Sequence, residues 1–182
     1  MSLLEIEGLT HSFGENLLYK NAGFTLNKGE HIGIVGQNGT GKSTLIKICT
    51  EQIIPDSGRI VWQPNTTIGY LDQYAEIDHT LTMKEFLKSA FTKLFEMEAQ
   101  ALQLYEKAAD GDMKSLELAA RYQEQLEAHD FYSIDTAIDR VANGLGLLAI
   151  GLDRPIAEMS GGQRAKVILA KLLLEKPDVL LL

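Results

Sequence analysis

The sequence predicts an α/β fold that combines a mixed sheet, antiparallel in part, with a helical subdomain. Three observations lead to this prediction. Short apolar stretches separated by turn residues fill the first 71 positions, which is typical of strands. From residue 79 onward apolar residues recur every three or four positions, as in amphipathic helices, and residues 179–182 form one further apolar stretch. We therefore expect a core made of residues 1–78 and 176–182 and a helical subdomain made of residues 79–175.

The expected strands are apolar or alternating and are bounded by turn residues: residues 3–9, 23–26, 31–35, 59–62 and 67–71. Residues 31–35 (HIGIV) are expected to be a short buried strand. They lead into a glycine-rich loop, after which residues 42–49 (KSTLIKIC) indicate a helix. The last two strands follow a turn at residues 55–58 and are expected to continue the same sheet.

Capping and breaking residues divide the helical region. Residues 110–112 (DGD) interrupt the periodic pattern, which predicts an antiparallel helical hairpin. A third helix is expected from Ser133, a possible N-cap, to Asn143 and Gly144, a natural C-cap pair. The last helix is expected to start at Ser160 and to end ahead of a proline.

Composition excludes several classes of protein. The net charge of −8 argues against a generic polyanion-binding surface, which would need clustered Lys and Arg. Residues 83–140 hold seven basic and twelve acidic residues, a net charge of −5. The simplest interpretation of these charges is a solvated helical face over a packed apolar stripe. The apolar runs are too short for a membrane span. The single cysteine, Cys49, excludes an internal disulfide and is expected to be a packing residue.

The stretch GQNGTGKST, residues 36–44, is the most informative motif. Its glycines let the loop turn N–H groups inward, and the helix that follows adds the positive end of its dipole, so the loop suits an anion. Lys42 adds a positive charge for the β- and γ-phosphates, and the Ser43 hydroxyl is placed to ligate Mg²⁺. The sequence thus predicts a site for a nucleoside triphosphate with Mg²⁺; a glycine-rich turn without a ligand is the alternative. The expected contact residues are Gly36, Gln37, Asn38, Gly39, Thr40, Gly41, Lys42, Ser43 and Thr44.

A second motif, MSGGQ at residues 159–163, stands at the start of the last predicted helix. Alone it is a weak signal, because a serine N-cap followed by flexible glycines would look the same. Downstream of a phosphate-binding loop it offers further amides and a hydroxyl at a helix N-terminus, which suits a second phosphate contact. The expected contact residues are Ser160, Gly161, Gly162 and Gln163.

With both motifs present, the chain resembles the ABC ATPases, a class of P-loop NTPases, over nearly its whole length. The family's phosphate loop matches residues 36–44, and its signature sequence matches residues 159–163, with Met159 where leucine is usual. The resemblance implies that Phe13 stacks on adenine; a buried residue at a strand end is the alternative. It also implies that Gln73 reaches Mg²⁺ or the attacking water; a surface amide is the alternative there.

Within that superfamily the chain resembles the N-terminal half of an ABC-F protein, a soluble class with two ATPase domains in one polypeptide that acts on ribosomes. The resemblance rests on the hairpin after Gln73, on a helix at residues 134–146 that leads into residues 152–155, and on a match that begins at the first residues. It implies a second ABC domain and the ribosome as partners, no membrane, and a cytoplasmic location. In this class the hairpin is an arm that reaches ribosomal components. Its acidic charge leads us to expect contact with protein, or a role in positioning the domains, rather than contact with RNA.

The same resemblance implies that a carboxylate and a glutamate needed for ATP hydrolysis follow the strand at residues 179–182. They are not in this sequence, so the only catalytic role implied here is the positioning role of Gln73. We expect a piece of a longer ATPase that binds ATP weakly and does not turn it over. Two rival hypotheses are the ATPase subunit of a membrane transporter and a non-catalytic nucleotide-binding module.

Overall fold

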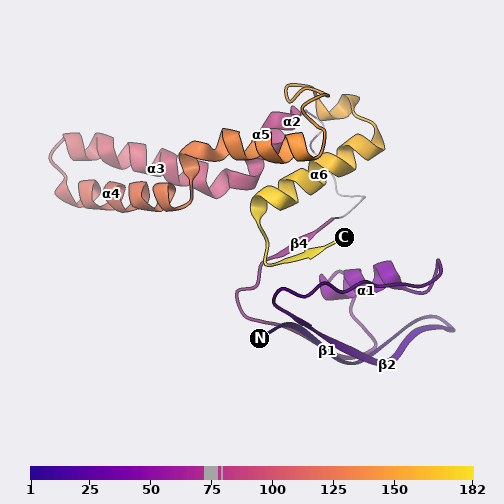
Figure 1. The fold of residues 1–182 in the computed structure, drawn as a ribbon. Coiled ribbons are helices and arrows are strands. Elements are labelled where there is room, and N and C mark those ends of the chain that lie inside the picture. Colours follow the sequence, from indigo (N-terminus) through magenta and orange to yellow (C-terminus); the bar gives the residue numbers. More distant parts are fainter. Residues whose placement is uncertain (72–77, 79) are drawn as a thin grey trace. The chain divides into compact units, whose positions relative to one another are not determined.

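Figure 1 shows the fold in a computed structural model, which describes residues 1–71, 78 and 80–182. The chain divides into two compact units. Unit 1 consists of Met1–Tyr70 and Pro177–Leu182, and unit 2 consists of Leu71–Lys176. Each unit contains its own cluster of buried apolar residues, so each is described by itself.

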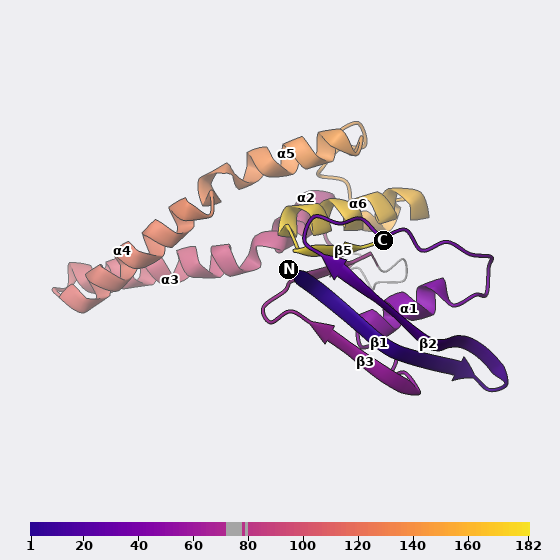
Figure 2. The same ribbon diagram turned by 60° about the horizontal axis from the view of Figure 1, so that its bottom comes forward.

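An antiparallel sheet forms most of unit 1. Its strands are β1 (Ser2–Phe13), β2 (Asn16–Asn27) and β3 (Ser57–Trp62), in the order β2-β1-β3, and Figure 2 shows them side by side. Apolar and acidic residues alternate along the first half of β1, which buries one face of the strand and exposes the other. The central residue Ile6 lies opposite Phe24 on β2 and Ile60 on β3. The antiparallel part of the predicted fold is thus confirmed.

Helix α1 (Lys42–Cys49) packs its apolar face on this sheet. Ile48 and Cys49 are buried in one cluster with Leu4, Ile6 and Leu9 of β1. Burial raises the pKa of the Cys49 thiol to about 11, so the thiol stays protonated and packs as a small apolar group. The observed helix has the bounds that the sequence predicts.

Two short parallel strands complete unit 1: β4 (Ile68–Tyr70) and β5 (Val179–Leu181). The Asp178 carboxylate accepts hydrogen bonds from the Thr67 N–H at 2.9 Å and from the Thr67 hydroxyl at 2.8 Å, which fixes the register of the pair. The expectation that both later strands continue one sheet is wrong. β3 joins β1, whereas β4 pairs with a segment far along the chain, a pairing that no local pattern specifies.

The buried strand predicted at residues 31–35 is also wrong. The segment is irregular and lies open to solvent, with exposed fractions of 47% for Ile32, 40% for Ile34 and 92% for Val35. An apolar run becomes a strand only when a neighbour satisfies its backbone groups. None of the strands in the described ranges pairs with this segment, so its apolar side chains remain uncovered there.

Unit 2 is helical. Its α-helices are α2 (Met83–Lys88), α3 (Thr92–Ala109), α4 (Met113–Ala128), α5 (Ile134–Gly144) and α6 (Gly161–Glu175), joined in part by the 3₁₀ turns η1 (Ser89–Phe91), η2 (Phe131–Ser133) and η3 (Ile156–Glu158). In Figures 1 and 2, α3 and α4 lie side by side and run antiparallel, as predicted, with the turn at residues 110–112. Among the residues that the structure describes, no helix is long and apolar enough to cross a membrane.

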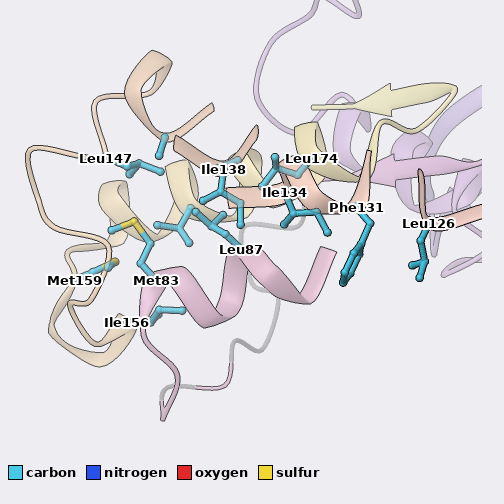
Figure 3. Close-up of a cluster of buried hydrophobic side chains, with 13 residues drawn as sticks. Met83, Leu87, Leu126, Phe131, Ile134, Ile138, Leu147, Ile156, Met159 and Leu174 are labelled. Atoms are coloured by element: carbon cyan, nitrogen blue, oxygen red, sulfur yellow. The ribbon is translucent and has the colours of Figure 1, made fainter. Parts of the chain in front are cut away.

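The core of unit 2 lies among α2, α5 and α6, and Figure 3 shows its side chains. Met83, Leu87, Ile138 and Val167 are completely buried there. Thr82 begins α2 with a capping box, in which its hydroxyl accepts from the Glu85 N–H and the Glu85 carboxylate accepts from the Thr82 N–H. This local chemistry fixes where α2 enters the core.

Both ends of α5 differ from the prediction. Ser133 makes no side-chain cap, because η2 runs directly into α5 and leaves Ser133 without the extended conformation that a cap requires. Gly144 lies inside the helix rather than after it. After α5, the glycine that adopts a left-handed conformation is Gly146, with a φ of 70°, two residues beyond Gly144.

Candidate functional site

The phosphate-binding loop predicted at residues 36–44 lies in unit 1 and leads directly into α1. Two of its glycines adopt conformations that favour glycine, with φ of 85° at Gly39 and 97° at Gly41. Gly41 is the N-cap residue of α1, and no side chain in the described part of the protein caps that end. The first N–H groups of α1 therefore lack intrahelical acceptors and carry the positive end of the helix dipole. This end of α1 can accept an anion.

A tight turn inside the loop joins Thr40 to Gln37. The Thr40 hydroxyl donates a hydrogen bond to the Gln37 carbonyl oxygen at 2.9 Å, and the Thr40 N–H donates to the same oxygen at 3.4 Å. A Cβ atom on Gly36 would lie 2.8 Å from the Thr40 Oγ1 atom. A larger residue at position 36 would therefore displace Thr40 and open the turn.

The Lys42 ammonium is held against the loop itself. Its Nζ atom donates hydrogen bonds to the carbonyl oxygens of Gly36 and Gln37, both at 2.9 Å. Neutral carbonyl oxygens are weaker partners for an ammonium group than charged phosphate oxygens. A phosphate that entered the loop could therefore replace these carbonyl oxygens as the partner of Lys42.

Phe13 and the loop border one hollow of about 430 Å³. Phe13 ends β1 with 55% of its side chain exposed, so the alternative of a buried residue does not hold, and its ring meets His11 edge to face at 4.9 Å. Asn16 and Leu18 of β2 line the same hollow. The loop contributes Asn38, Gly39, Gly41, Lys42, Ser43 and Thr44 to it. An exposed aromatic ring and an anion-accepting helix end thus share a hollow of the size that binds small molecules.

The predicted magnesium ligands are Ser43 and Gln73. Ser43 is exposed at the start of α1, and its hydroxyl oxygen is the donor that phosphate loops offer to Mg²⁺. In residues 1–71, 78 and 80–182, no group of three or more His, Cys, Asp or Glu residues could hold a metal. Mg²⁺ usually completes its shell with phosphate oxygens and water, so one hydroxyl beside the loop fits that ion. Gln73, the other predicted ligand, lies outside the described residues.

Tyr19 of β2 is a loop contact that the sequence reasoning missed. Its hydroxyl donates a hydrogen bond to the Gly41 carbonyl oxygen at the start of α1. Desolvation by burial raises the pKa of the Tyr19 phenol, so the hydroxyl stays a donor. A tyrosine in an alternating strand is usually a packing residue. Only the three-dimensional structure distinguishes this contact from ordinary packing.

A buried histidine lies beside the hollow. In the described part of the chain neither ring nitrogen of His11 has a hydrogen-bond partner, although Nδ1 lies 3.6 Å from the Asp56 carboxylate. The Ser12 hydroxyl and N–H both donate to Asp56 at 2.8 Å, which holds the pKa of that carboxyl below its usual value. His11 and Asp56 thus support the end of β1 that carries Phe13.

A larger hollow of about 840 Å³ in unit 1 also borders Lys42 and Ser43. Most of its other walls are apolar side chains of the sheet, α1 and β5, among them Leu4, Phe24, Leu45 and Leu181. Phosphate groups need hydrogen-bond donors or positive charge, which these apolar side chains do not offer. The hollow beside Phe13 therefore suits a nucleotide better.

The second motif lies in unit 2, at the start of α6. Ser160 caps the helix, because its hydroxyl accepts from the Gln163 N–H at 3.3 Å. The Gln163 side-chain oxygen accepts in return from the Ser160 N–H at 2.9 Å, which completes a capping box. Gly161 and Gly162 are exposed, and an added Cβ would meet nothing within 4 Å. The serine N-cap, which the sequence analysis gives as the alternative to a phosphate contact, is therefore present.

The family model described as ABC transporter matches residues 19–182. The chain is 45% identical to the uncharacterized ABC transporter ATP-binding protein YfmM of Bacillus subtilis, over all of this chain and 36% of that protein. It is 32% identical to the tylosin resistance ATP-binding protein TlrC of Streptomyces fradiae, over all of this chain and 34% of that protein. It is 36% identical to the energy-dependent translational throttle protein EttA of Escherichia coli K12, over 91% of this chain and 30% of that protein. The chain thus spans about a third of the length of these relatives.

Solved structures share the fold. An ATP-binding subunit of an ABC transporter matches 97% of this chain and 63% of its own with a TM-score of 0.65 and 21% identity. A nucleotide-free ATP-binding cassette from an ABC transporter matches 99% of this chain and 68% of its own with a TM-score of 0.58 and 22% identity. These likenesses confirm the predicted fold class.

Proposed function

The chain belongs to the ABC transporter family, and from that premise we propose that unit 1 binds ATP with Mg²⁺ as part of a larger ABC-F type ATPase. The observation that carries this proposal is the hollow that Phe13 shares with the phosphate-binding loop. Phe13 offers a face for the adenine ring, and Lys42 with the N–H groups of α1 offers positive charge for the phosphates. Mg²⁺, when bound beside Ser43, neutralises charge on the phosphate oxygens.

The signature residues are proposed to act on a different nucleotide. Ser160, Gly161, Gly162 and Gln163 lie in unit 2, at a helix N-terminus that offers amides and a hydroxyl. In ABC ATPases such a motif covers a nucleotide held by a second ABC domain, and we propose that partner here. For Gln73 we propose the role that the family resemblance implies, contact with Mg²⁺ or with the attacking water.

The ABC-F assignment and the ribosome as partner are supported by the relatives and by the long hairpin of α3 and α4. EttA carries a name that refers to translation, and two Arabidopsis thaliana relatives, each 32% identical, are named members of ABC transporter family F. A cytoplasmic location and ATP hydrolysis by the whole protein belong to the same proposal.

Titration with ATP and with AMP, each with Mg²⁺, tests the nucleotide site. We expect ATP to bind much more tightly than AMP, because the loop contacts the β- and γ-phosphates. Phe13→Ala should weaken ATP binding by about 1–3 kcal/mol, the usual worth of a base stacked on an aromatic ring. Tyr132→Ala, which removes an exposed aromatic ring from unit 2, is the matched control. Equal affinities for ATP and AMP would contradict the proposal.

A second candidate follows from the name of YfmM, an ABC transporter ATP-binding protein: the chain would serve as the ATPase of a membrane transporter. The two candidates differ in their partner. Cell fractionation of the whole protein with ATP or a non-hydrolysable analogue distinguishes them. Sedimentation with ribosomes supports the ABC-F proposal, and sedimentation with membranes supports the transporter.

A further inference from the structure

Tyr19 ties the sheet of unit 1 to the first turn of α1. It lies on β2, opposite His11 of β1, and its half-buried side chain reaches the loop. Its hydroxyl donates to the Gly41 carbonyl oxygen, which also accepts the first helical hydrogen bond from the Leu45 N–H at 2.9 Å. One oxygen atom therefore receives a bond from the sheet and a bond from the helix.

Holding this carbonyl also fixes an N–H group of the loop. The peptide between Gly41 and Lys42 is planar and trans, so its carbonyl and its N–H point in opposite directions. When Tyr19 and Leu45 fix the carbonyl, the Lys42 N–H is turned away from them, toward the open end of the helix. That end is where an anion is accepted.

Gly41 is the residue that permits this approach. A Cβ atom at position 41 would lie 2.5 Å from the Tyr19 hydroxyl oxygen and 3.2 Å from the Leu18 Cδ1 atom. Its φ of 97° also disfavours any residue with a side chain. Two independent requirements, space and backbone conformation, thus meet at the point where Tyr19 touches the loop.

We propose that Tyr19 is a positioning residue of the phosphate-binding loop: it orients the peptide between Gly41 and Lys42 and so sets the affinity for phosphate groups without touching the nucleotide. This role rests on the proposed function. It is distinct from packing, because packing requires the ring and the positioning role requires the hydroxyl. Tyr19→Phe removes the hydroxyl and keeps the ring.

The test compares three ligands and one ligand-free measurement in the wild-type chain and in Tyr19→Phe. We expect the variant to bind ATP·Mg²⁺ and inorganic triphosphate about three- to tenfold more weakly, the worth of one hydrogen bond, and to bind adenosine with unchanged affinity. Without ligand, the Leu45 amide should exchange its hydrogen faster, because its acceptor is less well held. Tyr132→Phe, which removes a hydroxyl bonded to Gln123 in unit 2, is the matched control and should change none of these values.

The outcomes separate the two proposals. Unchanged triphosphate affinity in Tyr19→Phe would overturn the role of Tyr19, whether or not the exchange of the Leu45 amide changes. Equal weakening of adenosine and triphosphate would also overturn it, since that pattern indicates general loosening of unit 1. A wild-type chain that binds neither ATP nor triphosphate would overturn the proposed function, while faster Leu45 exchange would still support the contact with the loop.

Discussion

Lys42 must exchange its partners when a phosphate enters the loop. Without a ligand its ammonium is satisfied by the carbonyl oxygens of Gly36 and Gln37. Its contribution to binding is therefore the difference between contacts with phosphate and contacts with carbonyl groups. That difference is favourable because a phosphate oxygen carries a negative charge that attracts the ammonium group, whereas a carbonyl oxygen carries only a partial charge.

Lys42→Ala should weaken binding of ATP·Mg²⁺ by about 1.5–3 kcal/mol, roughly a tenfold to hundredfold loss of affinity. Folding should change little, because the ammonium group is not part of the core. Isothermal titration calorimetry measures the loss, and Lys47→Ala, in the last turn of the same helix, is the control. Equal affinity of wild type and Lys42→Ala for ATP would contradict the assignment of the loop.

Gln163 shows that a residue of the signature motif can be structural. Its side-chain oxygen accepts the Ser160 N–H, so at least part of its role is to hold the cap of α6 in place. A glutamate at the same position can accept that bond equally well and suits the positive end of the helix. An alanine cannot accept it.

We therefore expect Gln163→Ala to lower the free energy of unfolding by about 1 kcal/mol, the usual cost of a lost cap, and Gln163→Glu to keep it. Denaturant unfolding followed by circular dichroism measures both. Gln103→Ala, at an exposed position inside α3, controls for the loss of a glutamine side chain. If Gln163→Ala and Gln163→Glu lowered the free energy of unfolding equally, the capping box would not be the source of the stability that Gln163 contributes.

At the scale of elements, the hairpin of α3 and α4 stands out because it carries little of the buried core of unit 2. Among its residues only Ala101, Ser115, Ala119 and Leu126 are buried. Exposed apolar side chains, including Leu102 and Met113, lie among acidic ones on its surface. Such a surface favours a protein partner over the phosphate backbone of RNA.

Binding of RNA by the chain should therefore be weak and should depend little on salt, since few counterions would be released. Affinities for ribosomal RNA fragments at 50 and 200 mM salt would show this. A variant with Glu117→Lys and Glu124→Lys, both on exposed positions of α4, serves as a positive control that should bind more tightly and more salt-sensitively. Strong, salt-sensitive binding by the unmodified hairpin would refute the expectation.

Elements delimited by local chemistry are the ones that the sequence predicts well. The glycines before Lys42 predict where α1 begins, and Ser160 predicts where α6 begins. The break at residues 110–112 predicts the turn of the hairpin. In each case the deciding residue is adjacent in sequence to the boundary that it sets.

Elements and contacts that depend on distant partners are predicted poorly. The apolar pattern of residues 31–35 cannot say whether a neighbouring strand is present, and the pairing of β4 with β5 has no local signal. The residues of the candidate site show the same difference between local and distant signals. The loop is recognisable from its own residues, whereas the contact between Tyr19 and Gly41 depends on how β2 meets α1.

At the scale of the whole molecule, the ring and the loop that are proposed to hold ATP lie in a different unit from the helical core. Phe13 and residues 36–44 belong to unit 1, and each unit has its own buried cluster. Damage to the core of unit 2 should therefore leave the loop intact. Ile138, completely buried in α5 and shown in Figure 3, is a suitable place to test this.

Ile138→Ala should lower the free energy of unfolding of unit 2 by about 2–5 kcal/mol and leave the affinity for ATP unchanged. Ile6→Ala, a cavity in the cluster that supports α1, is the matched variant and should lower both stability and ATP affinity. Chemical unfolding and ATP titration of each variant supply the two measurements. If Ile138→Ala also lowered the affinity for ATP, nucleotide binding by unit 1 would depend on the stability of unit 2.

The pairing of β4 with β5 also determines the order in which the protein can fold while it is being synthesised. Thr67 and its partner Asp178 lie 111 residues apart in the sequence, and all the residues of unit 2 lie between them. At roughly 5–20 residues per second, translation of that interval takes on the order of 5–20 s. Throughout that time β4 lacks β5 and presents an unpaired edge. Unit 2 can therefore fold before β4 and β5 pair, because that pairing must wait until Asp178 and β5 have emerged.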